Sequence, residues 1–193
     1  MVSGCQQKSP SSPVSPATEI PAHFTTYTNK QGLFSISYPS DWELYPITDE
    51  EWEYSASKVI NSIESDVPLE RSHGYHIAGL PETGYIPGVQ IEFAPLPEKV
   101  VKLDELTDTL VAEVEWDDFR VNTRLKTTID GREAAIVDYQ GIHDSNYRLR
   151  VLALVAIRSN KVRYGVACAS TVEEFSRWED DFYHILTSFR ILR

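Results

Sequence analysis

The sequence predicts an α+β domain in which a mainly antiparallel sheet carries helices on both faces, an α/β/α sandwich. Three observations support this fold class. Most strand-like segments follow one another through tight turns, as hairpins do, and not through helical crossovers. Three segments repeat apolar residues at helical spacing. The strand-like segment 147–157 is apolar on both faces in its middle, which requires a covering layer on each side of the sheet.

The body of the predicted domain opens with a hairpin. Aromatic and β-branched residues fill 24–28 and 33–38, and they flank a turn that contains Gly32. Pro39 ends the second strand because proline cannot donate to the strand ladder. Trp42 follows and is expected to cap the edge of the core.

A first helix is expected from residue 48 onward. Thr48 and Glu51 have the spacing of a capping box. Apolar residues then recur at helical spacing, namely Trp52, Ala56, Val59, Ile60 and Ile63. Residues 65–88 show neither a helical nor a strand period and contain four glycines and three prolines. They predict a long loop, of the kind that is usually functional or mobile.

The middle of the chain adds a strand and a second helix. Val89, Ile91 and Phe93 alternate as in a strand, which Pro95 and Pro97 end. The helix that follows has one apolar face and carries acidic residues elsewhere. Its apolar face consists of Leu103, Leu106, Leu110 and Val114.

The C-terminal half predicts strands and then a last helix. Strands 119–129 and 132–140 are joined by Asp130-Gly131, a strong hairpin signal. The doubly apolar segment 147–157 and a strand at 162–170 follow. Thr171 and Glu174 then predict a second capping box. The helix beyond has an aromatic stripe typical of a core face, formed by Phe175, Trp178, Phe182, Ile185, Leu186 and Phe189.

The sequence holds two cysteines, Cys5 and Cys168. Cys168 alternates onto the apolar face of its strand together with Val162, Tyr164 and Val166. A buried cysteine behaves as a small hydrophobe. We therefore interpret Cys168 as a core residue and not as a nucleophile, and we expect no disulfide.

The start of the chain, Val2-Ser3-Gly4-Cys5, resembles the lipobox of a prokaryotic lipoprotein, whose cysteine is lipidated. The charged and apolar regions of a signal peptide do not precede it, so we interpret the chain as trimmed of that peptide, with Met1 added. Residues 6–22 are rich in serine and proline and predict a disordered tether. The expected organisation is therefore a lipobox remnant and tether at 1–22 and one globular domain at 23–193.

Charge and hydropathy narrow the possible partners. The formal net charge is −11, and an acidic surface repels phosphate backbones, so no nucleic-acid partner is expected. No run of 18 apolar residues occurs, so membrane attachment would depend on acyl chains at Cys5. These features predict an extracytoplasmic, membrane-anchored lipoprotein.

No motif indicates catalysis, since none of the hydrolase, zinc-protease or nucleotide-binding patterns occurs. Glu70, His73 and His76 are weak candidates for a metal site because imidazole and carboxylate suit zinc or manganese, although two solvated loop histidines are the simpler interpretation. Carboxylate clusters at 117–118 and 179–181 lack the spacing of a calcium loop and are interpreted as solvated faces. No cofactor is expected.

The loop at 65–88 supplies the candidates for protein recognition. Tyr75, Leu80, Tyr85 and Ile86 offer apolar area at low entropic cost, as contact surfaces do. The alternative is that these residues fold over the sheet as a lid on the core.

Several segments together resemble a PsbP-like protein of the Mog1/PsbP fold. They are the stretch from Tyr27 through Gly32 to Trp42, the helix at 103–114, the hairpin at 128–134 and the terminal aromatic helix. The resemblance implies a non-enzymatic extracytoplasmic protein of a family whose members stabilise or assemble photosystem II in photosynthetic organisms, some with reported metal binding. The acidic composition differs from the basic surface of the plant extrinsic subunit, so PsbP-like lipoproteins of non-photosynthetic prokaryotes fit as well or better.

The sequence thus predicts a non-catalytic, lipid-anchored domain that binds or stabilises a partner at the membrane surface. The alternative is a lipoprotein that binds a metal or small ligand through the loop at 65–88.

Overall fold

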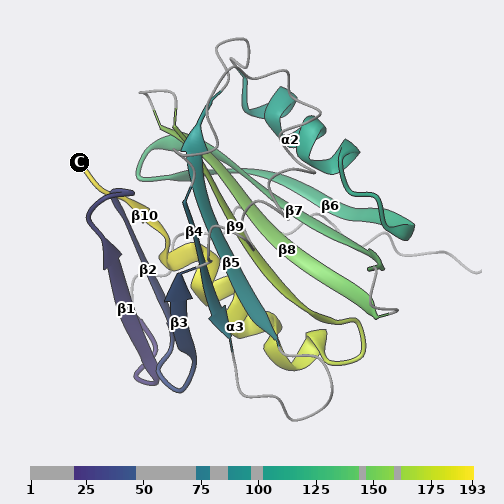
Figure 1. Cartoon of the computed structure of the whole chain (residues 1–193), viewed down its shortest axis with the longest axis horizontal. Helices are drawn as coiled ribbons and strands as arrows, with labels where there is room; N and C mark the ends of the chain where they lie inside the picture. The colour runs from purple at the N-terminus through teal and green to yellow at the C-terminus, as the bar shows by residue number, and fades with distance from the viewer. Residues whose placement is uncertain (1–19, 47–72, 79–86, 97–101, 144–146, 159–161) are drawn as a thin grey trace, which may run out of the picture.

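The computed structural model describes residues 20–46, 73–78, 87–96, 102–143, 147–158 and 162–193. Within them lie ten strands and two helices (Figure 1). The strands are β1 (Phe24–Asn29), β2 (Phe34–Pro39), β3 (Glu43–Pro46), β4 (His73–Ala78), β5 (Gly88–Pro95), β6 (Asp117–Ile129), β7 (Arg132–Ile142), β8 (Arg148–Arg158), β9 (Val162–Thr171) and β10 (Arg190–Ile191). The helices are α2 (Leu103–Ala112) and α3 (Phe175–Ser188).

The strands form two sheets, and every pairing among the described strands is antiparallel. The larger sheet has seven strands in the order β3-β4-β5-β9-β8-β7-β6. The smaller has three, in the order β1-β2-β10. The predicted mainly antiparallel sheet is confirmed, and so is the predicted hairpin of β1 and β2.

The two helices cover opposite faces of the large sheet. The main core lies on the α3 face, where Phe182 and Ile185 of α3 pack over strand residues such as Leu152. A smaller core lies on the α2 face, where Leu103 and Leu106 pack against strand residues such as Val155. Leu152 and Val155 both belong to β8 and are both buried. The predicted double covering of this strand is therefore confirmed.

The small sheet is joined to the main core through Phe34 of β2. Its ring is fully buried and lies within 6.5 Å, centroid to centroid, of the rings of Phe93, Tyr164 and Phe189. The Tyr164 hydroxyl donates to the Gly32 carbonyl at 2.8 Å, so the hairpin turn is bonded to β9. Gly32 has to be glycine because a Cβ there would come within 2.7 Å of the Phe93 ring.

The Asp130-Gly131 turn joins β6 to β7 as predicted. Both residues have positive φ, 50° and 74°, which is the conformation that a two-residue hairpin of type I′ requires. The Asp130 carboxylate also accepts a 2.8 Å hydrogen bond from the Ile191 backbone N–H. One turn therefore reverses the chain and fixes β10.

Substituting Gly131→Ala is expected to lower the free energy of unfolding by about 1–2 kcal/mol. A Cβ at this position would meet no atom within 4 Å, so the loss comes from backbone strain alone. Gly131→Asn is the matched control, because asparagine tolerates positive φ, and it should lose less than half as much. Chemical denaturation of the three proteins measures the difference, and equal losses for alanine and asparagine would contradict the explanation.

Three expectations need a correction or lie outside the described residues. The loop predicted at 65–88 is wrong for residues 73–78, which form β4 between β3 and β5. The capping box of Thr171 and Glu174 is also wrong, because Thr171 pairs with Leu149 in the sheet and α3 starts from Glu174 without a side-chain capping hydrogen bond. The first helix expected after residue 48 lies outside the described residues.

Neither of the two helices in the described residues, α2 with 10 residues and α3 with 14, has the length and apolar character that a membrane span requires.

Candidate functional site

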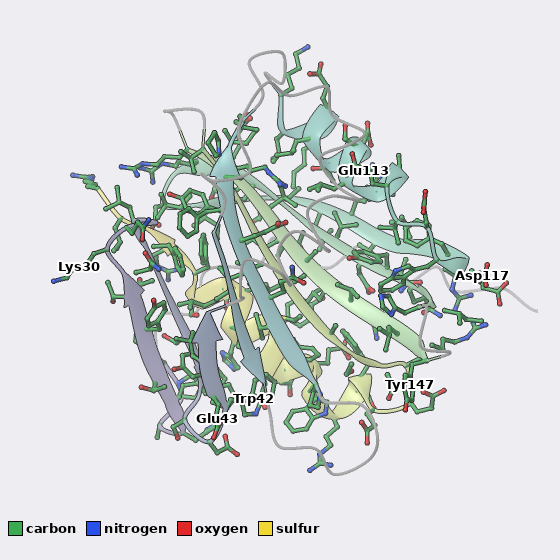
Figure 2. All side chains as sticks on the ribbon, in the orientation of Figure 1. Lys30, Trp42, Glu43, Glu113, Asp117 and Tyr147 are labelled. Carbon is green, nitrogen blue, oxygen red and sulfur yellow. The ribbon has the colours of Figure 1, made fainter. Side chains whose placement is uncertain are left out.

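A network of charged and amide side chains lies on the α3 face of the large sheet, where β6, β7 and β8 meet α3. Asp138 follows the buried Ile136 by two positions in β7, and Arg150 precedes the buried Leu152 by two positions in β8. Strand alternation therefore puts both charged residues on the core side. Figure 2 labels Asp117 and Tyr147, which mark this end of β6 and β8.

Arg150 holds the network together. Its Nε and Nη2 donate to the two oxygens of Asp138 at 3.1 and 2.8 Å, a bidentate pair. Nη2 also donates to Glu179 of α3 at 3.1 Å. The guanidinium carbon lies 4.0 Å above the centre of the Phe175 ring, within the range of a cation–π interaction. One side chain thus joins two strands to the first turns of α3.

The pKa values in the network are shifted in directions that favour the ion pairs. The hydrogen bond with Asp138 raises the pKa of the Arg150 guanidinium. Burial raises the pKa of the neighbouring Tyr183, and the charge of Glu179 raises it further. Both effects keep Arg150 charged and Tyr183 neutral around pH 7.

Amide side chains extend the network towards the edge of the sheet. Asn122 of β6 donates to Asp138 Oδ1 at 2.9 Å. When the Gln140 amide is oriented so that both its oxygen and its nitrogen have hydrogen-bond partners, the oxygen accepts from Arg120 Nη2 at 2.8 Å. Asp138 thereby receives three hydrogen bonds while its side chain is only 10% exposed. A carboxylate held in this way binds and orients its neighbours and is poorly placed to act as a general base.

A second ion pair lies on the opposite face of the sheet. Arg163 of β9 is buried, and its Nη1 is 3.7 Å from Glu92 Oε1 of β5. Burial raises the pKa of Tyr139, and the negative charge of Glu92 raises it further. Gly165 leaves the space for this carboxylate, because a Cβ there would come within 3.0 Å of Glu92 Oε1.

No group of three His, Cys, Asp or Glu side chains that could hold a metal ion occurs among the residues that the structure describes. The predicted metal site stays a prediction, because that description does not include the side chains of His73 and His76. His73 and His76 belong to β4 and not to a loop, and Glu70 lies outside the described residues. Among the acidic clusters, Asp118 pairs with Arg148 at 2.8 Å and Glu179 with Arg150.

The other predicted site residues lie mostly outside the described residues. Tyr75 is in β4, while Leu80, Tyr85 and Ile86 fall in the segment 79–86, which the structure does not describe. Cys5 likewise lies outside it. The assignment of these five residues to partner binding and lipidation therefore stays a prediction.

Cys168 is a core residue, as predicted. It is completely buried in β9 and free of a disulfide, and burial raises the pKa of its thiol well above the ordinary value. The thiolate is the reactive form, so this cysteine is unsuited to nucleophilic chemistry.

In a Cys5→Ala protein, Cys168 is expected to react with a thiol reagent at least about a thousandfold more slowly than a free thiol, because labelling requires the core to open. In denaturant the same protein should take up one full equivalent. Absorbance of the released chromophore measures both rates. Rapid labelling of the native protein would contradict the core assignment.

Sequence reasoning missed the Arg150 network. A signal was present, since Asp138 and Arg150 interrupt the inward apolar positions of two adjacent strands with opposite charges. Glu179 could not be added from the sequence, because its place depends on how α3 crosses the sheet.

Comparisons with known proteins agree with this architecture. A family model described as "PsbP-like protein" matches residues 5–191. No curated protein matches the sequence.

Solved structures from several organisms have a similar fold. Cyanobacterial PsbP (CyanoP) from Synechocystis sp. PCC 6803 has a TM-score of 0.60 at 11% identity, covering 92% of this chain and 97% of that one. LpqN of Mycobacterium tuberculosis, described as involved in cell envelope biogenesis, has a TM-score of 0.59 at 13% identity, with 89% and 92% covered. The Ran-binding protein Mog1p of Saccharomyces cerevisiae has a TM-score of 0.50 at 9% identity, with 88% and 95% covered. At these identities the likeness shows the fold alone, and the expected Mog1/PsbP fold is confirmed.

Proposed function

The chain belongs to the PsbP-like protein family, and from this membership we propose that it is a non-catalytic, lipid-anchored extracytoplasmic domain that binds or stabilises a protein partner at the membrane surface. The observation that carries the proposal is the family match itself, which runs from Cys5 through the folded body to residue 191. The lipobox pattern ending at Cys5 supplies the anchor, and the Ser/Pro-rich residues behind it supply the tether.

The chemistry of the described residues supports a binding role over an enzymatic one. The most buried carboxylate of the network, Asp138, is fully engaged by Arg150 and Asn122. The thiol of Cys168 is sealed in the core. A scaffold whose polar groups hold its own strands and helix together suits a protein that presents a surface to a partner.

The anchor is tested by mass spectrometry of the native protein, which should find acyl chains on Cys5. A Cys5→Ala protein should move from the membrane to the soluble fraction. Cys168→Ala is the matched control and should stay with the membrane, because its thiol is buried in the fold. An unmodified Cys5, or an alanine variant that stays with the membrane, would remove the anchor from the proposal.

Partner binding is tested separately by photo-crosslinking in the source membrane. A photoreactive residue replaces Tyr85 in one protein and Lys126, an exposed lysine of β6, in a control protein. We expect a discrete crosslinked protein from position 85 that is weak or missing from position 126. Equal products from the two positions would count against recognition through residues 75–86.

The metal alternative is separated by calorimetric titration of the full chain with zinc, manganese and calcium. The proposed function expects no binding heat that depends on the two histidines. A binding heat that disappears in a His73→Ala, His76→Ala double variant would favour the metal-binding lipoprotein instead.

A further inference from the structure

The turn between β6 and β7 contains the one Asp-Gly pair of the sequence, Asp130-Gly131. This pair is prone to a backbone reaction, because glycine has no side chain to keep its nitrogen away from the aspartate carboxyl group. Both residues are exposed, and a Cβ at Gly131 would meet no atom within 4 Å. Neighbouring side chains therefore do not shield the peptide bond, and its reactivity depends on the conformation of the turn and on the contacts of Asp130.

The reaction is the isomerisation of aspartate through a succinimide, with solvent water as the co-reactant. The Gly131 nitrogen forms a bond to Cγ of Asp130, and the carboxyl hydroxyl leaves with the amide proton as water. A second water then opens the ring at either carbonyl carbon. One opening restores aspartate. The other gives isoaspartate, in which the main chain runs through Cβ and Cγ and the carboxylate is attached to Cα.

The closed turn prevents this reaction. The ring forms only when Cβ of Asp130 and the Gly131 nitrogen are nearly eclipsed about the Cα–C bond. In a type I′ turn the first central residue has a ψ of about +30°, which places Cβ nearly opposite that nitrogen. Asp130 and Gly131 have the φ values of this turn, 50° and 74°, and Ile129 pairs with Arg132 across it. The turn therefore has to open before the ring can form.

β10 holds the turn through the carboxylate that would react. Asp130 Oδ2 accepts a 2.8 Å hydrogen bond from the Ile191 N–H, and Oδ1 is 3.8 Å from Arg190 Nε. Figure 1 shows β10, in the yellow C-terminal segment, beside the turn that follows β6. Ring closure turns the carboxyl group towards Gly131, so the contacts of Asp130 with β10 have to break first.

We infer that Asp130-Gly131 is a site of backbone isomerisation, that the docking of β10 sets its rate, and that the isoaspartyl product no longer holds β10. In that product the main chain of a two-residue turn is longer by one carbon atom. The carboxylate is also closer to the main chain by one bond, so it cannot bind the Ile191 N–H while β6 and β7 keep their register. A brief opening of the turn thereby leaves a lasting covalent change.

Loss of the bond to Asp130 leaves β10 with few backbone contacts. β10 pairs with β2 at two positions, and the Leu192 N–H donates to the Leu33 carbonyl at 2.8 Å. Ile191 is 4% exposed and belongs to the main core. A loosened β10 therefore exposes a core residue, and the isomerised protein is expected to open at its C-terminal end.

Incubation of the full chain in water enriched in heavy oxygen counts the passages through the succinimide, because each ring opening adds one labelled oxygen at residue 130. Peptide mapping by mass spectrometry locates the label. We expect labelling of the folded protein to be at least about tenfold slower than that of the same protein in denaturant, because only the open fraction reacts. Equal rates in the two states would overturn the inference.

Two variants separate the opening of β10 from unfolding of the whole protein. Ile191→Pro removes the N–H that binds Asp130, and labelling at residue 130 should rise about twofold to tenfold, as expected for the loss of one hydrogen bond. Leu106→Ala is the control, because Leu106 is fully buried in the smaller core on the α2 face. It should destabilise the protein and leave the labelling rate of the folded state unchanged. An equal rise in the two variants would mean that whole-protein unfolding, and not β10, controls the reaction.

The isomerised form of the unaltered chain tests the effect on β10 without a variant. It is separated by ion-exchange chromatography after ageing at neutral pH and is identified by peptide mapping. The amides of 190–192 should exchange hydrogen faster in the isoaspartyl form than in the fresh protein, while those of β8 should not change. Unchanged exchange at 190–192 would contradict the release of β10.

Discussion

Replacing Phe182 with alanine is expected to lower the free energy of unfolding by about 3–5 kcal/mol, the largest single effect among our predictions. Phe182 is fully buried in the middle of α3. Its ring centre lies 5.5 Å from that of Phe175 and 6.4 Å from that of Trp42, so its removal opens a cavity between the helix and the strands. Denaturant unfolding followed by tryptophan fluorescence measures the loss.

Phe24→Ala provides the matched control. Phe24 packs against the same core but is only half-buried at its rim, where the space can be refilled by water or by neighbouring side chains. Its loss should be less than half of that for Phe182. Comparable losses of unfolding free energy at the two positions would contradict the placement of Phe182 at the centre of the core and Phe24 at its rim.

Asp138→Ala is expected to destabilise the protein by about 2–3 kcal/mol. The change leaves Arg150 in a site where its side chain is only 25% exposed, with Glu179 as its remaining carboxylate partner. Because Glu179 and water still reach the guanidinium, the loss falls below that of a fully buried unpaired charge.

The control for Asp138 removes both charges together. An Asp138→Leu, Arg150→Met protein has no charge at either position and leaves only Glu179 without its partner. The Glu179 side chain is 38% exposed and can be solvated by water, so this protein should be more stable than Asp138→Ala. A double-mutant cycle with the single variants gives the coupling energy of the pair. A coupling energy near zero would show that Arg150 does not join β7, β8 and α3 energetically.

The parts of the fold that could be predicted from the sequence carry their own local signals. Asp130-Gly131 supplies positive φ without help from the rest of the chain. The aromatic residues of α3 recur at helical spacing along the whole helix. β4 was not predicted, because His73–Ala78 shows no clear alternation, and it becomes a strand through its neighbours β3 and β5. The capping box predicted from Thr171 was wrong because strand β9 extends to this residue, which pairs with Leu149 in the sheet.

The candidate site was less predictable than the fold. Strand alternation places Asp138 and Arg150 on one face, yet their bidentate pairing depends on the register of β7 and β8, in which Gln140 and not Asp138 lies directly opposite Arg150. A diagonal contact of this kind needs the twist of the sheet and the length of the arginine side chain. The residues predicted to recognise a partner do not belong to this network. They were chosen from the segment 65–88, whose irregular composition predicted a loop.

The small sheet is built from segments at opposite ends of the sequence. Arg190 and Ile191 of β10 pair with Ser35 and Phe34 of β2, and the Leu192 N–H donates to the Leu33 carbonyl at 2.8 Å. The first hairpin therefore cannot complete its hydrogen bonds until residues 190–192 reach it, although most of the sequence lies between the two segments. Such non-local closure slows folding, so the small sheet is expected to form late.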